Sequence, residues 1–152
     1  MSGDKENLKF KITLSGTFWN NPPKYSIWID DTLIKQSQIS KNSNEYEVIE
    51  FNLDLEESTH ALKIKLENKT NSDTIVENNQ IIKDTLLNIE SIEIDDMDLE
   101  KLKWSSQYLL DSPQEYQGKI IDHLDHCVNL GWNGTYILEF STPFYIWLLE
   151  NL

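Results

Sequence analysis

Tryptophans beside asparagines are the residues in this chain whose types and spacing best suit ligand binding. Trp19 precedes Asn20 and Asn21 in one polar segment, and Trp132 precedes Asn133 in another. An aromatic ring can stack on the apolar face of a sugar, while amide groups bond to its hydroxyls. These two segments therefore predict a glycan site. The alternative is that each ring closes one end of a hydrophobic core.

Two further tryptophans are candidates for the same site. Trp28 lies between Ile27 and Ile29, so in a strand it points to the opposite face, and Trp104 opens a polar segment. We include both in the predicted glycan site, with packing against the core as the alternative. Trp147, within an apolar segment, is predicted to be a core residue.

The segment between residues 68 and 88 is rich in oxygen-bearing side chains. Asn68, Asp73 and Asp84 represent the carboxylates and amides found there. Calcium binds about six to eight such oxygens. We therefore treat Asn68, Asp73 and Asp84 as a candidate Ca²⁺ site, with an ordinary hydrophilic loop as the alternative. Asp84 is also a candidate to bond to the glycan.

Other reactive residues are sparse. The segment 122–127 places His123, His126 and the single cysteine, Cys127, close together in sequence. Such a cluster can bind zinc, but the spacing provides no fourth ligand, so a solvated loop is the favoured interpretation. No nucleophile elbow, phosphate-binding glycine loop or H-E-x-x-H motif is present. We predict that the protein is not an enzyme.

The net charge excludes some partners. The 152 residues contain 13 lysines, no arginine and 26 acidic residues, which gives a net charge of −13. Nucleic acids and anionic membranes would repel such a protein. Because the N-terminus is polar and charged, we expect no signal peptide there. The longest apolar segment is far below the ~20 residues of a transmembrane helix. We expect synthesis in the cytoplasm of a host cell.

Hydrophobic residues alternate with polar ones along most of the chain, which is typical of half-buried strands. This pattern predicts a single all-β domain, an antiparallel, jelly-roll-like β-sandwich over residues 8–152, after a flexible tail at 1–7. Long polar loops are expected at 17–24, 41–44, 68–83 and 104–125. The predicted strands are 8–15, 25–29, 33–39, 49–55, 62–66, 86–95, 98–103, 136–140 and 144–149.

Two local patterns refine this prediction. In the predicted strand 86–95, the hydrophobic residues change from odd positions, Leu87 and Ile89, to even positions, Ile92 and Ile94. Either a β-bulge therefore lies near residues 90–91, or both faces of the strand are buried at one end. The pattern I-x-I-D-D occurs at residues 27–31 and 92–96, and predicts that each strand enters a tight turn at the aspartates.

The predicted last strand, Phe144–Leu149, is apolar on both faces. Such a strand must be covered on both sides. It is therefore either central in a sheet or docked on another subunit, which makes it a candidate for self-association or for binding a partner protein.

The stretch from His60 to Asp96 resembles calcium-dependent xylan-binding carbohydrate-binding modules. That family has H-x-I-x-V-x-F-x-N-D followed, after a loop, by D-R-N-L-Y-I-D-S-I-E-V-D-G. This chain reads H-A-L-K-I-K-L-E-N at 60–68 and D-T-L-L-N-I-E-S-I-E-I-D at 84–95, and I-W-I-D-D at 27–31 is similar to the family's V-x-V-D-G. Asn68 and Asp84 match the family's pattern, whereas Lys69 and Thr85 stand where the family has Asp and Arg. Across residues 8–96, the resemblance implies a β-sandwich that binds polysaccharide partly through calcium.

Most of the chain is also similar to small proteins of marine tailed bacteriophages. The shared stretches are N-L-G-W-N-G-T at 129–135 and T-P-F-Y-I-W-L-L-E-N at 142–151. This resemblance implies a phage-encoded protein that is associated with the virion. The first hypothesis is thus a non-catalytic module that binds polysaccharide or a cell-surface glycan. The second is a virion structural or decoration protein that binds capsid or tail subunits.

Overall fold

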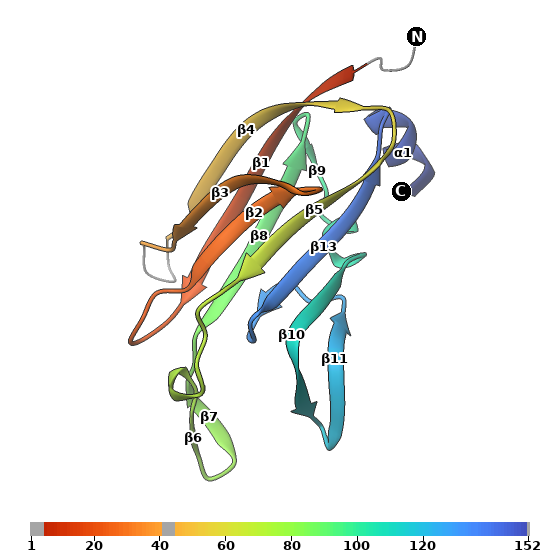
Figure 1. Ribbon diagram of the computed structural model, residues 1–152. Helices are drawn as coiled ribbons and strands as arrows, with labels where there is room; N and C mark the ends of the chain where they lie inside the picture. The colour runs from red at the N-terminus through yellow and green to blue at the C-terminus, as the bar shows by residue number, and fades with distance from the viewer. Residues whose placement is uncertain (1–4, 41–44, 152) are drawn as a thin grey trace.

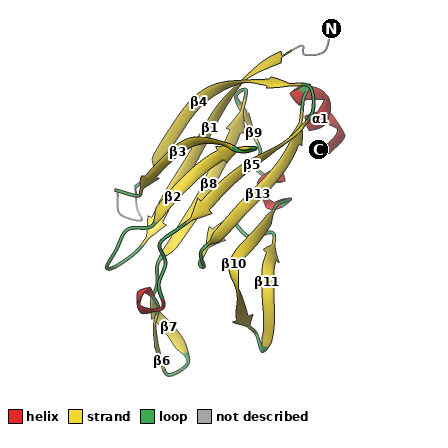
Figure 2. Cartoon of the chain, in the orientation of Figure 1, coloured by secondary structure: helices red, strands yellow, loops and turns green. Residues whose placement is uncertain are grey.

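The computed structural model describes residues 5–40 and 45–151, which form a sandwich of two antiparallel sheets (Figures 1 and 2). One sheet has the order β12 (Asn129–Leu130), β8 (Leu86–Ile94), β1 (Lys5–Thr17) and β4 (Glu47–Glu56), with β9 (Met97–Asp98) paired to β8. The other has the order β11 (Lys119–Asp125), β10 (Gln107–Tyr116), β13 (Gly134–Ser141), β5 (Thr59–Leu66), β2 (Lys24–Ile29) and β3 (Thr32–Gln38). The predicted all-β antiparallel sandwich is confirmed.

The core lies between the two sheets and follows the predicted alternation. Leu8, Phe10, Ile12 and Leu14 of β1 are fully buried. The ring of Phe10 meets that of Phe140 on β13 edge-on, with 5.9 Å between centroids. This contact joins the two sheets across the core.

The predicted bulge in β8 is confirmed. Thr13 pairs with Ser91 and the next residue, Leu14, pairs with Ile89, so Glu90 is the extra residue. Leu87, Ile89, Ile92 and Ile94 are all buried as a result. The bulge lets a strand whose hydrophobic parity changes keep one face toward the core.

The two I-x-I-D-D patterns are also confirmed as strand ends that enter turns. Asp30 and Asp95 have φ values of 53° and 50°, in the left-handed region that Asp tolerates better than most residues. Each carboxylate also accepts a backbone hydrogen bond from a neighbouring strand, Asp30 from Ala61 at 2.9 Å and Asp95 from Lys9 at 2.8 Å. The aspartates therefore form the turn and tie it to the sheet.

The predicted last strand is wrong, because Phe144–Asn151 forms the helix α1. Phe144 and Leu148 are buried four residues apart, which is the helical rather than the strand period. The carboxylate of Glu6 on β1 accepts the Phe144 backbone N–H at 2.9 Å, which caps the helix start. The apolar segment is therefore divided by helical periodicity into a core-facing side and an exposed side.

Two other predicted segments differ from the structure. Of the expected tail at 1–7, residues 5–7 already pair with β4, while residues 1–4 lie outside the described residues, as does the loop expected at 41–44. The strand expected at 98–103 is replaced by the short β9 and the 3₁₀ helix η2 (Leu102–Trp104).

The two longest predicted loops contain hairpins. Residues 68–83 include the 3₁₀ helix η1 (Asn71–Asp73) and the strands β6 (Ile75–Glu77) and β7 (Gln80–Lys83), and residues 104–125 include β10 and β11. Their side chains are largely exposed, as Ile120 illustrates with 72% exposure. A projecting hairpin buries few side chains and leaves no clear alternation of hydrophobic and polar residues.

Across residues 5–40 and 45–151, no helix combines the length and apolar character needed to cross a membrane.

A buried histidine gives the fold a defined pH dependence. His60 is 8% exposed, with Nδ1 2.7 Å from the Asp30 carboxylate and Nε2 2.7 Å from the Glu56 carbonyl oxygen. Burial lowers the pKa of His60, but the bonds to Asp30 and Glu56 outweigh it and raise the pKa above its usual value. The charged ring, which donates both bonds, is thus favoured in the folded protein.

We predict that the stability contributed by the His60–Asp30 pair is fully present below about pH 6.5, the pKa of an unfolded histidine. It decreases as pH rises through the pKa of His60 in the folded protein, which is higher. Asp30→Asn keeps a residue that tolerates the turn but removes the charge. It should lower the free energy of unfolding by about 1–2 kcal/mol at pH 6, and by less at pH 9. Urea unfolding at both pH values measures this. An equal loss at both would contradict the assignment.

Candidate functional site

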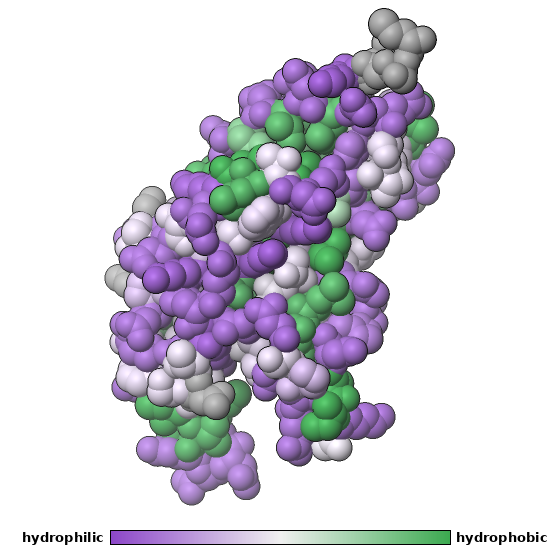
Figure 3. Space-filling view, viewed as in Figure 1, coloured by the Kyte–Doolittle hydropathy of each residue, from purple (hydrophilic) through white to green (hydrophobic). Residues whose placement is uncertain are grey.

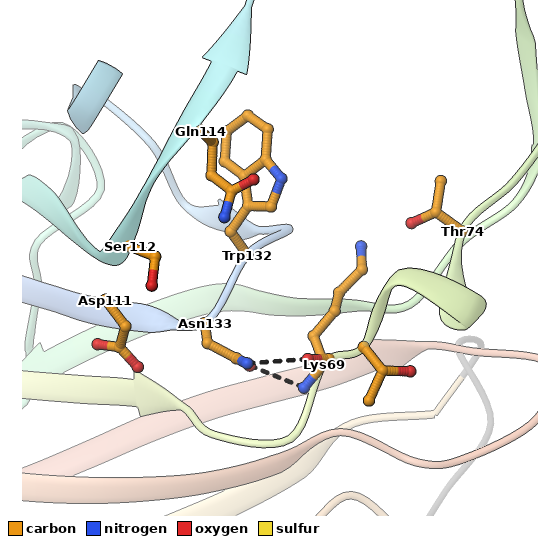
Figure 4. Close-up of a pocket in the computed structure, with 8 residues that line it drawn as sticks. Lys69, Thr74, Asp111, Ser112, Gln114, Trp132 and Asn133 are labelled. Atoms are coloured by element: carbon orange, nitrogen blue, oxygen red, sulfur yellow. Dashed lines mark hydrogen bonds between the residues drawn. The ribbon is translucent and has the colours of Figure 1, made fainter. Parts of the chain in front are cut away.

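Two hairpins, β6–β7 and β10–β11, project beyond the sandwich at the end opposite α1 (Figure 1). Between their bases is a pocket of about 270 Å³, which we call the hairpin cleft, and the space-filling view shows the hollow there (Figure 3). Its lining combines one aromatic ring with polar side chains (Figure 4). The lining residues are Lys69, Thr70, Thr74, Asp111, Ser112, Gln114, Trp132 and Asn133.

An irregularity in β10 forms one wall of the cleft. Leu109 pairs with His123, but the next paired residue on β10 is Gln114, opposite Ile121. Residues 110–113 therefore lack partners on β11, although Leu110 still pairs with Gly134 of β13, and Asp111 and Ser112 lie in the cleft wall. Bulges commonly redirect side chains in this way beside functional sites.

Trp132 forms the aromatic part of the wall from the loop between β12 and β13. Its ring meets that of Tyr116 on β10 edge-on, at 5.9 Å and 89°. Its carbonyl oxygen accepts a hydrogen bond from the buried Tyr108 hydroxyl. Contacts through both backbone and ring hold this tryptophan in place.

Asn133 fastens the opposite wall to the sandwich. Its side-chain Oδ1 accepts the Lys69 backbone N–H at 2.7 Å, and its Nδ2 donates to the Lys69 carbonyl at 2.8 Å. The amide thereby acts as a substitute strand partner for Lys69. This predicted glycan residue does line the cleft, and the structure gives it a positioning role in addition.

Lys69 and Asp84 form an ion pair beside the cleft. The Lys69 ammonium donates to the Asp84 carboxylate, and the two side chains are only 8% and 20% exposed. The same oxygen accepts the Thr74 hydroxyl at 2.7 Å and the Thr85 N–H at 2.8 Å. Burial raises the pKa of Asp84, but the bonds from Lys69, Thr74 and Thr85 outweigh it and hold the pKa below its usual value.

Asp73, at the end of η1, is the second acidic group near this ammonium. It is 2% exposed, and its carboxylate accepts the Thr70 N–H at 2.8 Å and the Asn20 amide at 2.6 Å. Burial raises the pKa of Asp73, whereas the bonds from Thr70 and Asn20 and the charge of Lys69 lower it, with a net decrease. Asp73 is thus a fully bonded structural carboxylate.

The predicted calcium ligands do not fit a calcium site. Asn68 uses its amide to donate to the Pro22 carbonyl and to accept the Lys24 N–H, while Asp73 and Asp84 are satisfied as described. The buried Thr85 hydroxyl lacks a hydrogen-bond partner within the described residues, but it offers one neutral oxygen. In residues 5–40 and 45–151, no three acidic, histidine or cysteine side chains form a group that could hold a metal.

The other predicted glycan residues lie outside the cleft lining. Trp19 is at the base of β6–β7, where its Nε1 donates to the Asp73 carbonyl and the Lys83 ammonium lies 4.9 Å from its ring centre. Trp28 is on the outer face of β2 under Lys65, and Trp104 is in η2. Asn20 supports Asp73, and Asn21 is exposed in the same loop. The structure therefore does not bring the four tryptophans together.

The 122–127 cluster is likewise divided. Asp122 and His123 bond to each other at the surface, whereas His126 bonds to the Trp104 carbonyl. Cys127 donates to the Asn129 carbonyl at 3.2 Å, and burial raises the pKa of its thiol. Each of these side chains has a local structural partner.

The fold is that of known carbohydrate-binding modules. Two solved structures match, one described as vCBM60 in complex with galactobiose and one as the selenomethionine form of vCBM60, from work linking two families of calcium-dependent carbohydrate-binding modules. The TM-scores are 0.53 and 0.54, with 8% identity in each case. The alignments cover 86% of this chain and 96% and 89% of the respective modules. No protein-family model and no curated protein matches the sequence.

Sequence reasoning missed six polar residues of the cleft lining, namely Lys69, Thr70, Thr74, Asp111, Ser112 and Gln114. They belong to the two segments interpreted as loops. The signal that could have found Asp111 is Gly134, because a glycine directly after Trp132-Asn133 indicates a close approach of another backbone. In the structure, the Asp111 N–H indeed donates to the Asn133 carbonyl at 3.0 Å.

We predict that Gly134→Ala destabilises the protein by about 1–3 kcal/mol. A Cβ atom at Gly134 would lie 2.3 Å from the Leu109 carbonyl oxygen, so β10 would have to move. Gly131→Ala is the matched control, because its Cβ would meet only the end of the Leu86 side chain at 3.2 Å. Thermal unfolding of both variants measures the difference, and equal stability would refute the close approach.

Proposed function

We propose that this protein is a non-catalytic glycan-binding module and that the hairpin cleft is its binding site. The observation that carries this proposal is the position of Trp132 in a polar cleft, at one end of a sandwich with the fold of carbohydrate-binding modules. The cleft offers one aromatic surface for stacking and several side chains that can bond to hydroxyls.

The chemistry of the lining favours a polar ligand with many hydroxyls. Thr74, Ser112 and Gln114 can each donate or accept a hydrogen bond, and Asp111 can accept several. The charge of Lys69 is already paired with Asp84. The unpaired charge in the lining is therefore acidic, so a neutral oligosaccharide suits the cleft better than an anionic one.

We predict that Trp132→Ala weakens glycan binding by about 30-fold, because truncating a central aromatic residue of a site commonly costs ~2 kcal/mol. Galactobiose, which one structural neighbour binds, and a panel of neutral oligosaccharides are the ligands to test. A glycan array identifies the ligand, and isothermal titration calorimetry gives the Kd.

Trp28→Ala is the control, since Trp28 lies on the outer face of the second sheet beneath Lys65. It should leave the Kd unchanged. Equal weakening by the two substitutions, with both variants folded, would place the site elsewhere. Absence of binding to every glycan on the array would refute the glycan-binding function itself.

A second candidate function follows from the exposed side of α1. Tyr145, Ile146 and Leu149 are 50%, 55% and 74% exposed, although the same helix buries Phe144 and Leu148. An apolar helix side of this kind suits a contact with another protein subunit. A phage virion protein that binds neighbouring subunits through α1 would use this side, and self-association is its simplest form.

If α1 mediates self-association, Leu149→Glu should convert an oligomer to a monomer, because it places a charge in the apolar contact. Size-exclusion chromatography with light scattering measures the mass. Glu150→Gln, at the neighbouring position, is the control. A monomeric wild-type protein at high concentration would exclude self-association through this helix.

A further inference from the structure

We propose that the Lys69 ammonium serves as the internal cation of the hairpin cleft, so that the cleft walls form without a divalent metal. The structural neighbours come from families described as calcium-dependent, whereas in this chain a lysine is bonded to Asp84, one of the predicted calcium ligands. Because this lysine would hold the cleft walls together, its role can be tested without a glycan.

Asp84 joins both ends of the β6–β7 hairpin to Lys69. One carboxylate oxygen accepts three donors, from Lys69, Thr74 and Thr85. Thr74 follows η1, and Thr85 precedes β8, so the three bonds join the two ends of the β6–β7 hairpin to Lys69. A cation in this position closes the base of the hairpin.

The Lys69 ammonium lies near two carboxylates, those of Asp73 and Asp84. Asp73 and Asp84 both have pKa values below the usual range, and the charge of Lys69 contributes to both decreases. One ammonium thus balances two largely buried carboxylates. A divalent ion at Asp84 would have to displace this ammonium or lie beside it, and two close positive charges repel each other.

Lys69 is held firmly by its surroundings. Its backbone N–H and C=O are both held by the Asn133 amide, and its side chain is 8% exposed. The ammonium is therefore fixed in place rather than free to leave for solvent. A mobile surface lysine could not replace a bound ion in this way.

The experiment measures the melting temperature of the full chain in excess chelator and in 5 mM calcium chloride, at matched ionic strength. We expect the two values to agree within about 1 °C. A ligand at 100 times its Kd would stabilise a protein of this size by several degrees. The proposal would be overturned if calcium raised the melting temperature by several degrees and the Asp84→Asn variant did not show this rise.

The variants test the ion pair directly. Lys69→Met keeps most of the side chain but removes the charge, and should lower the melting temperature by about 5 °C or more. Lys35→Met, at an exposed position on β3, is the control and should change it little. Adding Asp84→Asn to the Lys69→Met variant should not lower its melting temperature further. If the two losses add, the side chains act independently, and the proposal is overturned.

Discussion

The hairpin cleft depends on the contact between Asn133 and the backbone of Lys69. One amide supplies both a donor and an acceptor to Lys69, as a neighbouring strand would. Gly134 lets β10 approach within the space that a side chain would fill. Asn133 and Gly134 are consecutive. Asn133 binds the segment after β5 through Lys69, and Gly134 packs against β10 on the other side. The loop that carries Trp132 is held between them.

The lysine held by this contact then organises the charges of the same region. A chain with a net charge of −13 must separate or neutralise its carboxylates wherever it buries them. At the base of β6–β7 it neutralises Asp84 directly with Lys69 and satisfies Asp73 with Thr70 and Asn20. The acidic segment that suggested a calcium site is therefore explained by internal bonding. Aspartate and asparagine can either bind calcium or satisfy hydrogen bonds within the protein. Only their partners in the folded structure distinguish these two roles.

Much of the sandwich could be predicted from the sequence because burial on one face imposes a period of two. The alternation in β1, the parity change in β8 and the aspartate turns all follow from that constraint, and each is found in the structure. Where a strand buries neither face, its sequence need not alternate between hydrophobic and polar residues, so the strand cannot be recognised from that pattern. The β6–β7 and β10–β11 hairpins project into solvent, so their sequences resemble loops. The helix α1 was misinterpreted for the opposite reason, since a short segment of nearly continuous apolar residues fits either period.

The candidate site was harder to predict than the fold because most of its lining comes from those projecting hairpins and their bases. Trp132 and Asn133 were identified by residue type, but their partners Asp111, Ser112 and Gln114 come from an irregular strand with no hydrophobic signal. Tryptophan content alone also predicts more rings than the cleft contains, since Trp19 and Trp28 lie outside its lining and each has a lysine over its ring. In an acidic protein that contains lysine but no arginine, these contacts have a common cause. Lysines are drawn to carboxylates and to the electron-rich faces of aromatic rings, and each such contact removes a ring or a carboxylate from the set that a ligand could use.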